Sequence, residues 1–96
     1  MKTLKSITLL TIDNKPMVDA ATGKELTTAN LITICLGQSK YASMAEQWQA
    51  YEITKKIEEG DVELEDAEYD LVKKKVEEFE PYRNGFTFMP FLELFK

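Results

Sequence analysis

Few residues of this chain could carry out catalysis, because its 96 residues include no histidine and a single cysteine. The missing histidine excludes Ser-His-Asp and Cys-His mechanisms, histidine-ligated zinc and histidine pH switches. Cys35 lies close in sequence to Lys40 and Tyr41, but a reactive thiolate needs a neighbouring base or a strong positive field. We therefore expect Cys35 to be an unreactive residue of the core.

Carboxylates are the most abundant potential ligands, since residues 58–80 hold 11 acidic residues and three lysines. A hard cation needs several oxygen ligands from a tight loop, which Asp61, Glu63, Glu65 and Asp66 could supply. The segment lacks the order of acidic residues and the internal glycine that an EF-hand calcium loop requires. Its charges are therefore more typical of a solvated helix face. A third interpretation lies between a metal site and a solvated helix face: the acidic residues could form a docking surface for a basic partner.

Two other patterns fall short of a catalytic or phosphate-binding site. Glu46 and Glu52 could form an acid–base pair, but no further residues support them, and Glu46 follows Ser43 at the spacing of a capping box. Lys24 follows Gly23 without the full spacing of a phosphate-binding loop, which predicts a turn. The sequence thus predicts no catalytic residue, no metal and no cofactor.

The segments that would position these residues form one domain, 1–96, because so short a chain has no room for two independent cores. Residues 1–26 predict a β-hairpin or a small meander. Branched residues dominate positions 4–12, and turn sequences at 13–16 and 21–24 enclose a short return strand. With helices expected after this region, the fold class is α+β, with two to three packed helices.

Residues 27–80 form the helical region, and two helices are predicted ahead of the acidic segment. Thr27 or Thr28 can cap the first helix, which we expect to end at Gly37. Ser43 begins the second helix, which extends to Gly60. The broad apolar face of the second helix, which we expect to pack mainly into the core, comprises Ala45, Trp48, Ala50, Tyr51 and Ile53.

A third helix is predicted over residues 65–80 by the regular spacing of its apolar side chains. Spacings of three, four and three residues place these side chains on one face, which we expect to be buried. Pro81 ends the helix. The stripe comprises Tyr69, Val72, Val76 and Phe79.

The last segment, 81–96, is rich in aromatic residues, because half of the chain's ten aromatics lie in its final 15 residues. One interpretation is that this segment folds back and completes the core. The other is that part of it is buried against a second subunit, because so small a domain has little space for all these rings. On the second interpretation the protein self-associates through this segment. The candidate interface residues are Tyr82, Phe86, Phe88, Phe91 and Phe95.

Several short motifs of this chain stand in the same order as in a known group of proteins. They are the turn at 13–16, Leu26-Thr27 at a helix start, Tyr51-Glu52-Ile53 in the second helix and Leu71-Val72-Lys73 in the third. In these positions the chain resembles a group of small uncharacterised phage and prophage proteins, over residues 13 to about 93. The resemblance consists of hydrophobic and turn positions and includes no catalytic residue, so it implies a phage or prophage origin rather than a mechanism.

These features predict a non-enzymatic interaction protein, encoded by a phage or prophage, that acts through protein–protein contacts or as a homodimer. The alternative is an oligomeric module that binds a small molecule or nucleotide, of the anti-defence sponge type. A net charge of −5 disfavours nucleic acid as a partner. The longest apolar stretch, near 31–36, is too short to span a bilayer. The unpaired cysteine and the absence of a signal-peptide pattern predict the cytoplasm of the bacterial host.

Overall fold

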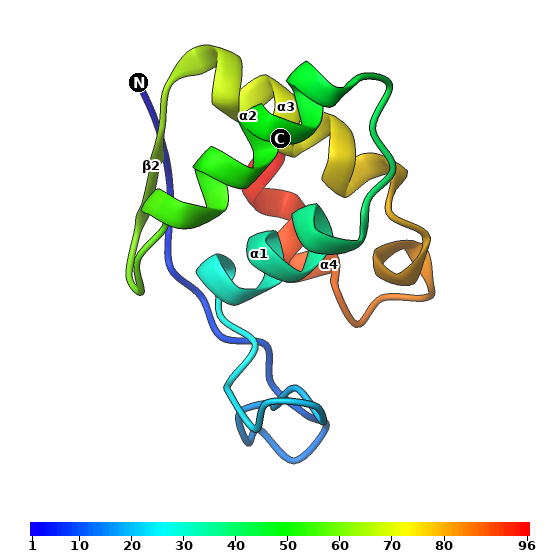
Figure 1. The fold of residues 1–96 in the computed structure, drawn as a ribbon. Helices are drawn as coiled ribbons and strands as arrows, with labels where there is room; N and C mark the ends of the chain where they lie inside the picture. The colour runs from blue at the N-terminus through cyan, green and yellow to red at the C-terminus, as the bar shows by residue number, and fades with distance from the viewer.

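The computed structural model describes residues 1–96 and has the α+β class that the sequence predicts (Figure 1). Three main helices pack on one another, and a two-stranded sheet lies beside them. In chain order, the elements are β1 (Lys2–Leu4), α1 (Thr28–Gln38), α2 (Met44–Lys56), β2 (Val62–Leu64), α3 (Asp66–Glu78), the 3-10 turn η1 (Glu80–Arg83), α4 (Met89–Leu92) and the 3-10 turn η2 (Glu93–Phe95).

The first strand has a partner far along the chain. β1 pairs antiparallel with β2, so that Lys2 lies opposite Leu64 and Leu4 lies opposite Val62. Leu4, Val62 and Leu64 are buried whereas Glu63 is exposed, because side chains alternate between the two faces of a strand. The sequence analysis does not predict β2, because three residues within an acidic segment are too few for a periodic signal.

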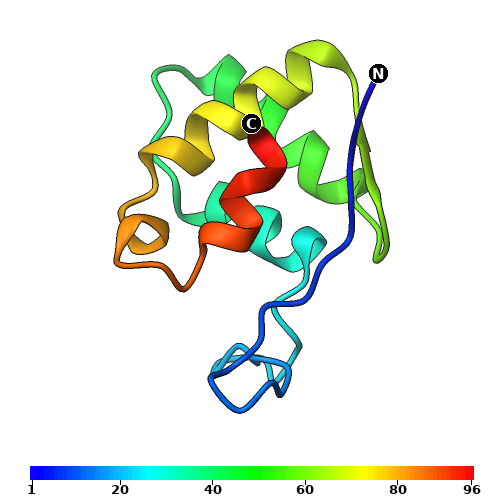
Figure 2. The same ribbon diagram turned by 180° about the vertical axis from the view of Figure 1, so that it is seen from behind.

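Residues 8–26 form a small meander that projects from the helical body in both views (Figures 1 and 2). Three backbone hydrogen bonds join its strands in a ring. Met17 N–H donates to Leu9 C=O (2.8 Å), Leu26 N–H to Met17 C=O (2.9 Å), and Leu9 N–H to Leu26 C=O (3.1 Å). These pairings are isolated bridges rather than long strands. Little of the meander is buried, since Leu9 and Leu26 are its only residues in the core.

Helix α1 begins at the predicted cap and ends later than predicted. The Thr27 hydroxyl accepts a hydrogen bond from Asn30 N–H at 3.3 Å, as expected of an N-cap. Gly37 does not end the helix, since α1 continues to Gln38. The chain turns away at Ser39, whose hydroxyl donates to the Cys35 carbonyl at 2.7 Å and so satisfies one of the helix's last acceptors.

Helix α3 confirms the predicted apolar stripe. Val72 and Val76 are fully buried, and Tyr69 and Phe79 pack against the core while remaining partly exposed. The helix contacts α1, α2, β2 and η1. Burial of these side chains is the main force that holds the helices together.

The C-terminal segment covers the side of the helical layer opposite α2 (Figures 1 and 2). Tyr82 is buried, and its hydroxyl donates to the Leu31 carbonyl at 2.7 Å. The Phe91 ring lies 5.6 Å from the Tyr82 ring and 5.5 Å from the Phe95 ring, both edge to face. Phe91 and Phe95 are buried as well. Most of the tail therefore completes the core, which is the first of the two interpretations of its aromatic content.

Candidate functional site

The outer side of α2 carries the largest group of exposed apolar side chains on a single helix. Met44, Trp48 and Tyr51 are 65%, 58% and 53% exposed, respectively. Spacings of four and three residues place them on one side of the helix. The Trp48 and Tyr51 rings are in edge-to-face contact, with centres 5.8 Å apart. Together with Gln47 these residues line a hollow of about 290 Å³, and we refer to the four residues as the α2 face.

The prediction that Trp48 and Tyr51 belong to the core is wrong. The core side of α2 is narrow, because Ala50 and Ile53 are its only buried residues. Each residue advances about 100° around an α-helix. Trp48 and Tyr51 each precede a buried residue by two positions, so both rings point away from the core. The helix thus presents small and medium apolar side chains to the core and its largest ones to solvent.

A second hollow, of about 220 Å³, lies between α2 and the end of α1. It shares Gln47 and Tyr51 with the first hollow, and Gly37 and Thr54 lie on its opposite sides. Gly37 adds no side chain there, and a Cβ atom at that position would meet nothing within 4 Å. Because the two hollows share Gln47 and Tyr51, the α2 face adjoins the hollow at the end of α1.

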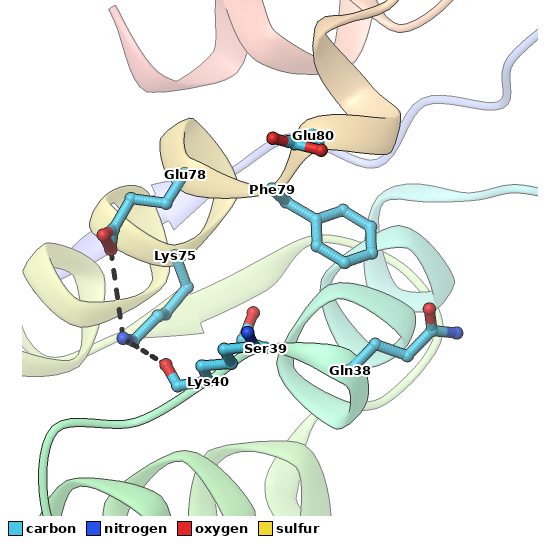
Figure 3. A pocket seen from close by; sticks show the side chains of 7 residues that line it. All are labelled: Gln38, Ser39, Lys40, Lys75, Glu78, Phe79 and Glu80. Carbon is cyan, nitrogen blue, oxygen red and sulfur yellow. Dashed lines mark hydrogen bonds and ion pairs between the residues drawn. The ribbon is translucent and has the colours of Figure 1, made fainter.

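The largest polar hollow, of about 450 Å³, is formed by α3 and the end of α1 (Figure 3). Lys75 is buried at its edge, and its ammonium group lies 2.8 Å from the Lys40 carbonyl and 2.9 Å from Glu46 Oε1. Glu78 Oε1 is 3.9 Å away and the centre of the Tyr41 ring is 4.8 Å away. Since all these partners are acceptors or a ring face, the lysine is neutralised within the protein. It connects α3 to the α1–α2 loop and to α2.

Glu46 has a second role that its sequence spacing does not reveal. Its backbone N–H donates to the Ser43 hydroxyl at 3.2 Å, as the predicted cap requires. Its carboxylate, however, pairs with Lys75 from another helix. The capping box alone therefore does not account for Glu46, and the pair with Lys75 could only be found once the packing of α2 on α3 was known.

Cys35 is fully buried and is placed as the sequence predicts. Burial raises the pKa of the Cys35 thiol to about 11, so the thiol stays protonated near neutral pH. The thiol sulfur lies 3.7 Å from the Ser39 hydroxyl oxygen. A protonated, buried thiol is a poor nucleophile, which agrees with a structural role.

The four acidic residues considered as a cation site do not converge, and no group of three or more Cys, Asp or Glu side chains gathers in a metal-binding arrangement. Asp61 accepts a hydrogen bond from Ser6 N–H at 2.7 Å, and Glu65 caps α3. Glu63 and Asp66 are exposed, and the Asp66 carboxylate lies 3.6 Å from the N-terminal amine. These carboxylates thus organise the ends of local elements.

The five candidate interface residues of the tail separate into two groups. Tyr82, Phe91 and Phe95 are core residues of this chain, which corrects their assignment to an interface, and Phe88 is partly buried against the core. Phe86 alone is largely exposed, at 87%. The three buried rings are unavailable to another subunit because they pack on one another and on α1.

Other exposed apolar side chains lie on the projecting meander. Leu10, Ile12 and Val18 are exposed there, without the ring contact that joins Trp48 to Tyr51. A mixed hollow of about 580 Å³ separates this region from the C-terminal segment, and its lining includes Leu10 and Glu93. The α2 face is therefore the more continuous apolar surface.

The Glu46–Lys75 pair should stabilise the fold in a pH-dependent manner. The hydrogen bond from Lys75 lowers the pKa of the Glu46 carboxyl below its ordinary value of 4.5. The stabilisation is therefore complete above that value and is lost as the pH falls through the lower pKa of the folded state. We expect Glu46→Gln to melt at a lower temperature than the unmodified chain at neutral pH, and the gap to close as the pH falls below 4.5.

Thermal melts of both chains across this pH range test the expectation. Glu52→Gln is the matched control, because its exposed carboxylate lies 3.9 Å from Lys55 on the same helix and contributes little. A melting gap that persists unchanged at acidic pH would contradict a stabilising role for the ionised Glu46 carboxylate.

Comparisons of the chain with protein-family models, with curated proteins and with solved structures found no match. None of the helices has the length and apolar content needed to cross a membrane.

Proposed function

We propose that this chain is a non-enzymatic interaction protein, which acts through contacts with another protein or with itself. The observation that carries the proposal is the exposed α2 face. Tryptophan, tyrosine and methionine are enriched at the centres of protein interfaces, and tryptophan and tyrosine often dominate their binding energy. Contiguous apolar side chains of this kind at a protein surface often mark a functional site.

The buried titratable residues Lys75 and Cys35 support the same proposal, because the packing of the protein accounts for both. Lys75 is neutralised by Glu46 and by the Lys40 carbonyl, and the Cys35 thiol is buried and protonated. Catalysis requires a nucleophile or an acid–base group that is free to reach a substrate. In this chain the buried titratable groups are used to hold helices together.

The alternative, a module that binds a small molecule or nucleotide, has less support. An anion site needs a cationic side chain that is free to face the ligand. The hollow beside Lys75 is also lined by Glu78 and Glu80, whose charges oppose an anionic ligand. The phage or prophage origin implied by the sequence resemblance agrees with either function and does not choose between them.

A photo-crosslinking residue in place of Trp48 tests the proposal. We expect the substituted chain, in the cells from which the sequence comes, to form a covalent adduct of discrete mass with a protein. A crosslinking residue in place of Glu77, which is exposed on α3, is the control. The adduct at position 48 should decrease when Tyr51→Ala is added, since Tyr51 belongs to the same face. Equal labelling at positions 48 and 77 would contradict the proposal.

A further inference from the structure

We infer that the partner of the α2 face is a second copy of this chain, so that the protein forms a symmetric dimer in which two α2 helices lie against each other. This inference rests on the proposed function and names the partner. Two properties of the α2 face favour a second copy, namely its charge and its self-complementary composition, and its area indicates how strong the contact would be.

The charge of the α2 face suits self-association. The chain has a net charge of −5, but residues 58–80 alone contribute −8, so the excess negative charge lies outside α2. Beside the aromatic rings stand one acid and one base, Glu52 and Lys55, whose charged atoms are 3.9 Å apart. The Lys55 ammonium also lies 5.3 Å from the centre of the Tyr51 ring. The face is thus locally neutral, and two copies can approach without like-charge repulsion.

A heterologous partner with strong charge would find less complementarity on this face. A basic protein would be attracted to the acidic segment 58–80, which lies mainly on β2 and α3. The α2 face offers neither a net charge nor a row of free charged groups. A second copy presents a neutral apolar surface with one acid and one base, so Glu52 of each copy can face Lys55 of the other.

The composition of the face also complements itself across a twofold axis. In a symmetric dimer the same patch is used by both subunits, so each residue type must tolerate its counterpart. If two α2 helices cross antiparallel near Trp48, the Trp48 and Tyr51 rings of one copy meet the apolar face of the other. The Gln47 amide both donates and accepts hydrogen bonds, so it can pair with Gln47 of the second copy.

The area of the face indicates a weak, reversible dimer. A buried aromatic side chain contributes about 150–250 Å², and the two rings and Met44 are each more than half exposed. Together they present on the order of 400 Å². Stable interfaces bury about 800 Å² on each partner, and smaller ones are transient. A contact of this size is therefore expected to be weak and reversible.

Sedimentation equilibrium of the full chain and two variants tests the dimer. We expect the unmodified chain to change reversibly from monomer to dimer between about 1 and 500 µM. Trp48→Ala should weaken dimerisation at least about tenfold. Phe86→Ala is the matched control, because Phe86 is also an exposed aromatic side chain but lies in the C-terminal segment. This variant should dimerise like the unmodified chain. Circular dichroism melts should show that both variants are folded, since each replaced ring is exposed.

The outcomes separate this inference from the proposed function. A chain that stays monomeric at all concentrations, while position 48 crosslinks to a different protein, overturns the dimer and leaves the interaction function standing. Loss of dimerisation in Phe86→Ala but not in Trp48→Ala overturns the inference and moves the interface to the tail. A monomeric chain that also shows no selective crosslinking at position 48 overturns both proposals.

Discussion

Val76→Asp is expected to unfold the whole domain. Val76 is fully buried in α3, the helix that contacts both α1 and α2. A carboxylate at this position would have no partner, and burying such a group costs on the order of 5 kcal/mol. The total stability of a small domain is only about 5–15 kcal/mol. The variant should therefore lose most of its helical circular dichroism signal at room temperature and show no cooperative melt.

The neighbouring substitution Glu77→Ala is the control for Val76→Asp. Glu77 is exposed on the same helix, so its replacement should change the free energy of unfolding by less than about 0.5 kcal/mol. A Val76→Asp variant with the unmodified melting temperature would mean that the stripe on α3 does not face the core.

Phe91→Ala is expected to lower the free energy of unfolding by about 3–5 kcal/mol. Phe91 is fully buried, and its ring is packed between those of Tyr82 and Phe95. Phe86→Ala removes the same side chain from an exposed position and should cost less than about 0.5 kcal/mol. Urea unfolding of the two variants measures the difference. Equal effects would contradict the assignment of Phe91 to the core and of Phe86 to the surface.

Because of the same packing, truncation of the tail would not separate a role in the core from a role in an interface. A chain that ends after Asn84 lacks both Phe91 and Phe95, and it would lose part of the core along with any interface. Point substitutions of exposed residues separate the two effects, because they leave the buried rings in place.

The sequence predicts the parts of the fold that depend on local signals. The spacing from Tyr69 to Phe79 predicts the buried side of α3, and Thr27 and Ser43 mark the starts of α1 and α2. These signals are reliable because capping and helical periodicity act within one or two turns of the chain. β2 escapes prediction because its pairing with β1 spans most of the chain and only three residues take part.

The candidate site is harder to predict than the fold, for a physical reason. Trp48 and Tyr51 are large and apolar, and such residues are usually buried. Whether α2 turns them inward depends on how closely α1 and α3 approach the helix, which no local pattern records. The one hint in the sequence is that Ala50 and Ile53 form a competing apolar side, two positions from the rings. Lys75 and Glu46 likewise meet only through tertiary packing.

The fluorescence of Trp48 tests the central claim most directly, because it is the only tryptophan of the chain and lies within the α2 face. We predict that its emission shifts to shorter wavelength, and that a soluble quencher reaches it less, as the chain concentration rises from about 1 to about 500 µM. The change should follow the same concentration dependence as dimer formation in sedimentation, and it should persist in Phe86→Ala. Emission and quenching that stay constant across this range, whether the chain remains monomeric or assembles, would contradict the burial of the α2 face against a second copy.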